Sequence, residues 1–112
     1  MIREATPDDV AAIHNMIVGL AEFEMEPDAV TATPADLHEA LFGQRPALFA
    51  HVADDAEHGV VGFSLWFLNY STWLGTHGIY LEDLFVQPEH RGSGYGKALL
   101  ANLARICVER GY

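Results

Sequence analysis

The chain has 112 residues, with 16 acidic and 6 basic side chains and a formal net charge of −10. This length accommodates one small domain, and the acidic balance disfavours nucleic acid and anionic membranes as partners while suiting a cationic substrate. No apolar stretch approaches the ~20 residues of a membrane span, and the amino terminus has no apolar signal region. A single cysteine excludes an internal disulfide and fits a reducing compartment, so we expect a cytoplasmic protein. From the length we expect one domain over residues 1–112.

The first third of the chain predicts a short strand and two helices. Residues 2–4 form the strand. Thr6-Pro7-Asp8-Asp9 has the N-cap, first-turn proline and acidic third position of a helix start, and this helix should end near residues 22–24. Its apolar side chains recur every three or four residues and predict one buried stripe, consisting of Val10, Ile13, Ile17 and Leu20. Thr33-Pro34-Ala35-Asp36 repeats the start signal for a short helix that Gly43 ends.

The middle of the chain predicts three strands. Residues 47–53 and 60–69 flank a polar turn and should pair as a hairpin, with Gly62 marking a bulge or a close neighbour. A loop over residues 71–78 precedes a central strand over residues 79–87. The order β-α-α-β-β-β-α predicts an α/β (α+β) fold with a largely antiparallel sheet and helices packed on it.

A glycine loop, R-G-S-G-Y-G from Arg91, joins the central strand to a helix that begins near Tyr95 and stops at Gly111. The first N–H groups of a helix have no intrahelical acceptor and lie at the positive end of the macrodipole, so the loop predicts an anion site. Two basic side chains, Arg91 and Lys97, bracket it and favour a ligand that carries phosphate. The spacing fits neither a P-loop, which needs four residues between its glycines, nor the dinucleotide fingerprint, which needs Gly or Ala in place of Lys97.

This loop, following the strand sequence L-E-D-L-F-V, resembles the acetyl-CoA motif of the GNAT N-acetyltransferases. The longer run from N-Y-S-T-W-L-G at Asn69 to Gly96 is similar to the diamine (spermidine/spermine) branch, and the resemblance covers the chain from I-R-E-A-T-P-D-D at Ile2. It implies the GNAT fold, a mostly antiparallel mixed sheet flanked by helices, which continues with further strands and a helix. We expect the chain to hold the N-terminal two-thirds of such a domain. The alternative is a strand–helix turn whose glycines serve packing alone.

The resemblance implies acetyl-CoA as co-substrate. It places the pyrophosphate on the glycine loop, formed by Arg91, Gly92, Ser93, Gly94, Tyr95, Gly96 and Lys97. It also places the pantetheine arm along the strand edge of Leu84, Phe85 and Val86, where one N–H group would face the thioester carbonyl.

Glu82 is the candidate general base. Acyl transfer to an amine needs a neutral amine, a stabilised oxyanion and a protonated leaving thiolate. Glu82 lies among apolar residues of the central strand, so we expect burial to raise its pKa, with Asp83 on the opposite face of the strand. The resemblance also places a substrate-contacting carboxylate at Glu82. The alternative is an exposed or ion-paired carboxylate.

The resemblance further assigns substrate contacts to Phe23, Glu24 and Trp73. Polyamine-specific members carry Asp two residues before this tryptophan, whereas this chain has Ser71, as in the sister group that acts on thialysine-like amines. The family's general acid is a tyrosine in the C-terminal part, and its role does not transfer to Tyr95 or Tyr112.

The remaining chemistry-bearing residues predict no metal and no thiol chemistry. Cys107 lies on the apolar face of its helix, and the six histidines show no metal-ligand spacing.

We expect an N-acetyltransferase that uses acetyl-CoA and acts by direct amine attack in a ternary complex. Its substrate would be a polyamine or a thialysine-like amino acid, and the complete protein would be a homodimer. The alternative is a non-catalytic or partner-dependent acyl-CoA-binding module.

Overall fold

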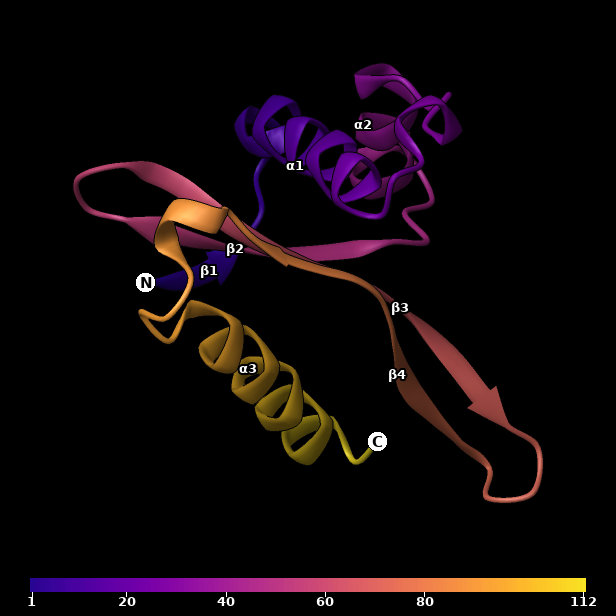
Figure 1. Cartoon of the computed structure of the whole chain (residues 1–112). Coiled ribbons are helices and arrows are strands. Elements are labelled where there is room, and N and C mark those ends of the chain that lie inside the picture. Colours follow the sequence, from indigo (N-terminus) through magenta and orange to yellow (C-terminus); the bar gives the residue numbers. More distant parts are fainter.

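The computed structural model describes residues 1–112 and contains one four-stranded antiparallel sheet in the order β1-β2-β3-β4. The strands are β1 (Ile2–Glu4), β2 (Phe49–Asp55), β3 (Gly59–Ser71) and β4 (Thr76–Val86). Helices α1 (Val10–Phe23) and α2 (Pro34–Phe42) cover one face, and α3 (Tyr95–Arg110) covers the other (Figure 1). The structure therefore has three layers and confirms the predicted fold class. No helix is both long and apolar enough to cross a membrane.

Both predicted helix starts are present as capping boxes. Before α2, the Thr33 hydroxyl accepts the Asp36 N–H at 3.1 Å, and the Asp36 carboxylate accepts the Thr33 N–H at 2.8 Å. Before α1, the carboxylate of Asp9 accepts the N–H of Thr6 at 2.7 Å. There a short 3-10 turn, η1 (Pro7–Asp9), precedes the α-helix. The local signals therefore placed these helices correctly.

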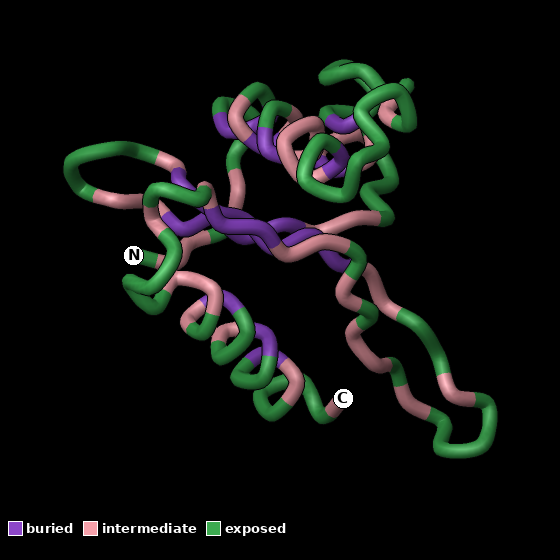
Figure 2. Tube along the Cα trace, viewed as in Figure 1, coloured by how far each residue is buried: buried purple, intermediate pink, exposed green.

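Buried residues lie in the middle of the sheet and in the helices on both of its faces (Figure 2). The larger core cluster, under α1 and α2, consists of Val10, Ile13, Met16, Leu37, Leu41, Ala50, Val52, Phe63, Leu65 and Phe85. Two smaller clusters on the α3 face contain Ala53, Val61, Val86 and Leu99, and Trp66, Leu103 and Ile106. In α1, Met16 holds a fully buried place that the predicted stripe omitted, whereas Ile17 and Leu20 are only half-buried.

Two bulges change which face of the sheet each side chain occupies. Ala53 pairs with Gly62 but Asp54 pairs with Val60, so Val61 is an extra residue in β3. Likewise Leu65 pairs with Asp83 but Trp66 pairs with Leu81, which leaves Glu82 as the extra residue of β4. A bulge resets the alternation of side chains along its strand. The expectation for Gly62 is confirmed, because a Cβ there would lie 3.0 Å from the carbonyl oxygen of Phe85.

Beyond the helices, β3 and β4 continue as a two-stranded arm whose far end is exposed (Figures 1 and 2). The connection is shorter than predicted, since β3 runs to Ser71 and β4 begins at Thr76. Pairing such as Tyr70 with His77 extends the hairpin into the predicted loop. In this sheet β4 is an edge strand, with β3 as its one neighbour.

Candidate active site

An open pocket of about 600 Å³ lies where the end of α1, the end of β4 and the glycine loop meet. Its lining residues are Leu20, Phe23, Leu84, Phe85, Val86, His90, Arg91, Gly92, Gly94, Tyr95, Gly96 and Lys97. The structure thus brings together all the predicted cofactor residues except Ser93, whose hydroxyl donates to the carbonyl of His90 outside this pocket.

The backbone of the loop leaves helix N–H groups free at the pocket. After β4, a single 3-10 turn, η3 (Pro88–His90), leads into the loop, where Gly92 and Gly94 have φ of +87° and +89°. Residues other than glycine rarely adopt this backbone conformation. The first bond of α3 runs from the Ala98 N–H to the Gly94 carbonyl at 3.0 Å. The N–H groups at the start of α3 therefore have no intrahelical acceptor, which makes this helix start suitable for an anion.

The Arg91 side chain contacts both the end of α1 and the end of β4. Its Nε donates to the Val86 carbonyl at 2.9 Å. The guanidinium carbon lies 5.2 Å from the ring centre of Phe23 and 5.3 Å from that of Phe85, within cation–π range. Phe23, predicted as a substrate contact, thus lies against Arg91 at the edge of the pocket that contains the predicted cofactor residues.

Tyr95 reaches the other way, toward the turn between β2 and β3. Its hydroxyl donates to Asp55 Oδ2 at 2.6 Å. This hydrogen bond raises the pKa of Tyr95 and, from the other side, lowers the pKa of Asp55. The phenol group of Tyr95 is therefore bonded away from the pocket. Its backbone, at the start of α3, is the part of Tyr95 that faces the predicted anion site.

The prediction that Glu82 is desolvated is wrong, because its side chain is exposed at the β4 bulge. Asp83 is the half-buried carboxylate instead. Burial raises the pKa of Asp83, and the negative charges of Glu82 and Glu24 raise it further. Glu82 is thus an exposed strand carboxylate, and its role as the general base stays a prediction. Asp83 now has the environment expected of a proton acceptor.

Asp83 and Glu24 line one hollow of about 200 Å³ at the end of α1, together with Glu26. The sequence reasoning missed Asp83, although it follows Glu82 directly, since no local signal shows the bulge that orients it. Trp73, in contrast, is 96% exposed at the tip of the arm and lines neither this hollow nor the larger pocket. The structure therefore groups Glu24 with Asp83 and leaves Trp73 apart from them.

Comparison with known proteins finds relatives over nearly the whole chain. Residues 14–112 match the model of the acetyltransferase (GNAT) family. Thialysine N-epsilon-acetyltransferase of Bos taurus is 37% identical over 118 residues, which cover 99% of this chain and 69% of that protein. Spermidine/spermine N(1)-acetyltransferase-like protein 1 of Homo sapiens is 34% identical over 113 residues, covering 96% of this chain and 16% of that protein.

Solved structures of other proteins share the fold. The crystal structure of a probable acetyltransferase superimposes with a TM-score of 0.80 at 20% identity, covering 97% of this chain and 72% of the other. At 20% identity the structural similarity shows the fold alone, and the sequence matches show the family. On both grounds the chain belongs to the acetyltransferase (GNAT) family, whose members are acetyl-transferring enzymes.

Proposed function

We propose that the chain transfers the acetyl group of acetyl-CoA to a primary amine of a small molecule. The observation that carries this proposal is the pocket in which a free helix start, a glycine loop and the end of β4 meet. The carboxylates of Glu24 and Asp83 line a neighbouring hollow and supply the negative charge that an ammonium group needs. The thialysine and spermidine/spermine relatives support an amine as acceptor.

The donor is held by the loop and the strand edge. The pyrophosphate accepts hydrogen bonds from the free N–H groups at the start of α3, with Lys97 as a counter-charge. Nothing lies within 4 Å of a Cβ built on Gly92 or Gly94, so the space above these glycines is open to a ligand. The pantetheine arm adds along residues 84–86 at the edge of β4, where unpaired backbone groups can bond it.

The reaction proceeds by direct attack in a ternary complex. The neutral amine nitrogen attacks the thioester carbonyl carbon, and a backbone N–H of β4 stabilises the oxyanion that forms. The carbon–sulfur bond then breaks, the CoA thiolate takes up a proton, and the amide product loses the amine proton to a base. Glu82 is the proposed base, acting from its exposed position through water. Asp83 is the second candidate, because burial raises its pKa.

Among amines, we propose a thialysine-like amino acid with a terminal amino group in preference to a polyamine. The Ser71 position lacks the acidic side chain of polyamine-specific members, and the thialysine relative matches over 99% of the chain. We also propose a cytoplasmic homodimer, as the family resemblance implies. Sizing chromatography with light scattering measures the assembly state.

A turnover assay on the protein, produced at the full length of its gene, tests the proposal. CoA release is followed with thialysine, spermidine and a no-amine blank. Glu82→Gln should lower kcat about 10²–10⁴-fold if Glu82 is the general base. The matched variant Asp83→Asn should mainly raise KM for the amine. The rate should rise from about pH 7 to pH 9, because aliphatic amines titrate near pH ~10 and the neutral form attacks.

Each result has a distinct meaning. A loss of kcat in Asp83→Asn with normal kcat in Glu82→Gln would assign the base to Asp83. Acetyl-CoA binding without turnover of any amine would favour the non-catalytic acyl-CoA-binding module.

A further inference from the structure

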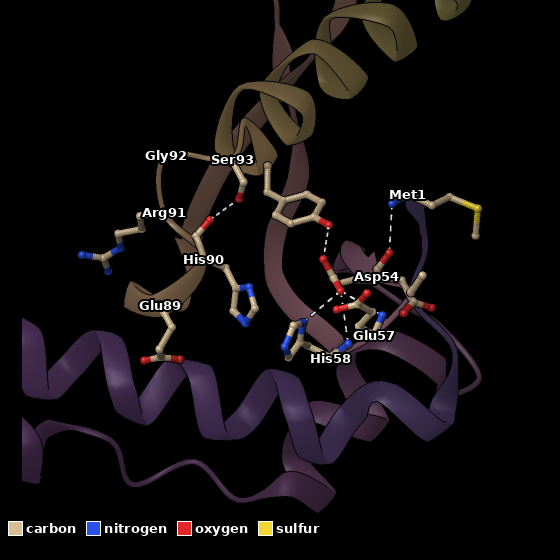
Figure 3. A pocket seen from close by; sticks show the side chains of 12 residues that line it. Met1, Asp54, Glu57, His58, Glu89, His90, Arg91, Gly92 and Ser93 are labelled. Atoms are coloured by element: carbon tan, nitrogen blue, oxygen red, sulfur yellow. Dashed lines mark hydrogen bonds and ion pairs between the residues drawn. The ribbon is translucent and has the colours of Figure 1, made fainter.

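Two histidines and an aspartate meet beside the cofactor pocket, which His90 also lines (Figure 3). Asp55 ends β2, His58 lies in the turn between β2 and β3, and His90 ends η3, directly before the glycine loop. One potential ligand atom from each of the three lies within 4.8 Å of the other two. The expectation that the chain binds no metal rested on local spacing alone, and that spacing does not reveal His90, which is far in the sequence from Asp55 and His58.

The three side chains are close to the geometry of a metal site. His58 Nδ1 lies 3.1 Å from Asp55 Oδ1, and the His58 and His90 ring centres are 4.7 Å apart. In a tetrahedral zinc site with bonds of about 2.0–2.2 Å, neighbouring ligand atoms are separated by about 3.3 Å. Asp55 and His58 already have this separation. One ring nitrogen of His90 lies within 4.8 Å of a ligand atom of each of the other two residues, so binding requires the His90 side chain to move closer to them.

Asp55 is held in place by partners of its own. Its Oδ1 accepts the N–H groups of Glu57 at 2.9 Å and His58 at 3.1 Å, and its Oδ2 accepts the Tyr95 hydroxyl at 2.6 Å. Outer partners of this kind orient the ligands of metal sites and raise their affinity. The carboxylate is therefore fixed by the fold before any ion arrives.

The surroundings favour a cation. The hollow that these residues line, of about 940 Å³, is also lined by Glu57 and Glu89 and by Asp54, whose carboxylate is paired with Arg3. The Met1 ammonium group also lies there and donates to the carbonyl of Asp54. The basic side chain nearest in sequence, Arg91, points away from the histidines and donates to Val86 instead (Figure 3). Two imidazoles and one carboxylate form a ligand set that suits zinc.

We propose that Asp55, His58 and His90 bind a zinc ion, with water in the fourth position. The ion joins the β2–β3 turn to η3 and so restrains the residue that precedes Arg91 in the glycine loop. The site is separate from the transfer chemistry, and its function is to hold this loop in place.

Zinc titration followed by calorimetry tests the proposal, using protein that carries no polyhistidine tag and has been stripped with a chelator. The wild type should bind one zinc ion per chain, and zinc should raise its Tm. His58→Gln and His90→Gln should each weaken zinc binding at least about tenfold, since even outer-sphere changes cost about 10–100-fold. His77→Gln, which alters an exposed histidine outside the cluster, is the matched control and should bind zinc as the wild type does.

Cobalt provides a second readout that depends on the ligands. Co²⁺ in the wild type should show the intense visible absorption of a four-coordinate site, and both cluster variants should lose it. Equal zinc affinity in His58→Gln, His90→Gln and His77→Gln, or no binding by the wild type, would overturn the proposal. If circular dichroism shows that His90→Gln does not fold, His58→Gln decides alone, because His58 is exposed in a turn.

Discussion

At the residue scale, Gly94 combines an unusual backbone with a functional position. Its φ of +89° strains any side chain with a Cβ, and it immediately precedes the free N–H groups of α3. Gly94→Asp adds a negative charge where we place the pyrophosphate, so acetyl-CoA should bind at least about tenfold more weakly, a change of about 1.4 kcal/mol. Calorimetric titration measures it.

Gly75→Asp is the matched control, because Gly75 has a φ of +68° at the tip of the arm. It introduces the same strain and the same charge away from the pocket, and should bind acetyl-CoA as the wild type does. Equal weakening in both variants, or in neither, would remove the glycine loop from the donor site.

The sequence predicted a desolvated carboxylate on β4 but assigned it to the wrong one of two neighbouring residues, Glu82 and Asp83. The sequence predicted desolvation of Glu82 with Asp83 on the opposite face, whereas the structure exposes Glu82 and half-buries Asp83. The reason is the bulge at Glu82, which turns Asp83 to the side of Glu24. A bulge depends on the register with β3, and the sequence of β4 alone does not contain that information.

At the element scale, the start of α1 depends on Asp9. This buried carboxylate accepts the Thr6 N–H and two bonds from Arg3, at 2.8 and 3.0 Å, so it caps the helix and ties it to β1. Asp9→Ala should lower the free energy of unfolding by about 2 kcal/mol, from the lost cap and from an Arg3 guanidinium left with Asp54 as its one carboxylate partner. Urea denaturation measures the loss, and Asp9→Asn, which retains a cap acceptor, should lose less.

The matching control is Asp36→Ala in the exposed capping box of α2, which has no arginine partner. Its effect should be clearly smaller than that of Asp9→Ala. The hydrogen bond with Arg3 lowers the pKa of Asp9. The stability that Asp9 provides is therefore fully present above about pH 4 and declines as the pH falls further, which a Tm series should show. Equal losses in the two alanine variants would contradict the role of Arg3.

At the scale of the whole molecule, His51 lies buried between β2 and the α3 layer. Its Nδ1 accepts the Trp66 indole N–H at 3.3 Å. Burial lowers the pKa of His51, so the unfolded chain, in which histidine titrates near pH ~6.5, binds more protons than the folded one. The free energy of unfolding should therefore decline as the pH falls below about 6.5 and level off below the folded pKa.

His51→Gln keeps a hydrogen-bond acceptor for Trp66 but cannot titrate. Urea denaturation between pH 7.5 and 5 should show a flatter dependence for this variant, while His77→Gln, an exposed histidine, should keep the wild-type slope. A wild-type slope in His51→Gln would exclude His51 as its source.

The sequence by itself determined the helix starts, the glycine loop before α3, the family and the antiparallel character of the sheet. The helix starts and the loop depend on residues within about four positions of one another, such as Thr33 with Asp36 or the glycines before α3. Only the tertiary structure decided which carboxylate of β4 is buried, where Arg91 points and which residues meet at His90. Each of these depends on strand register or on the packing of layers, and so on contacts between residues far apart in the chain, which no local pattern records.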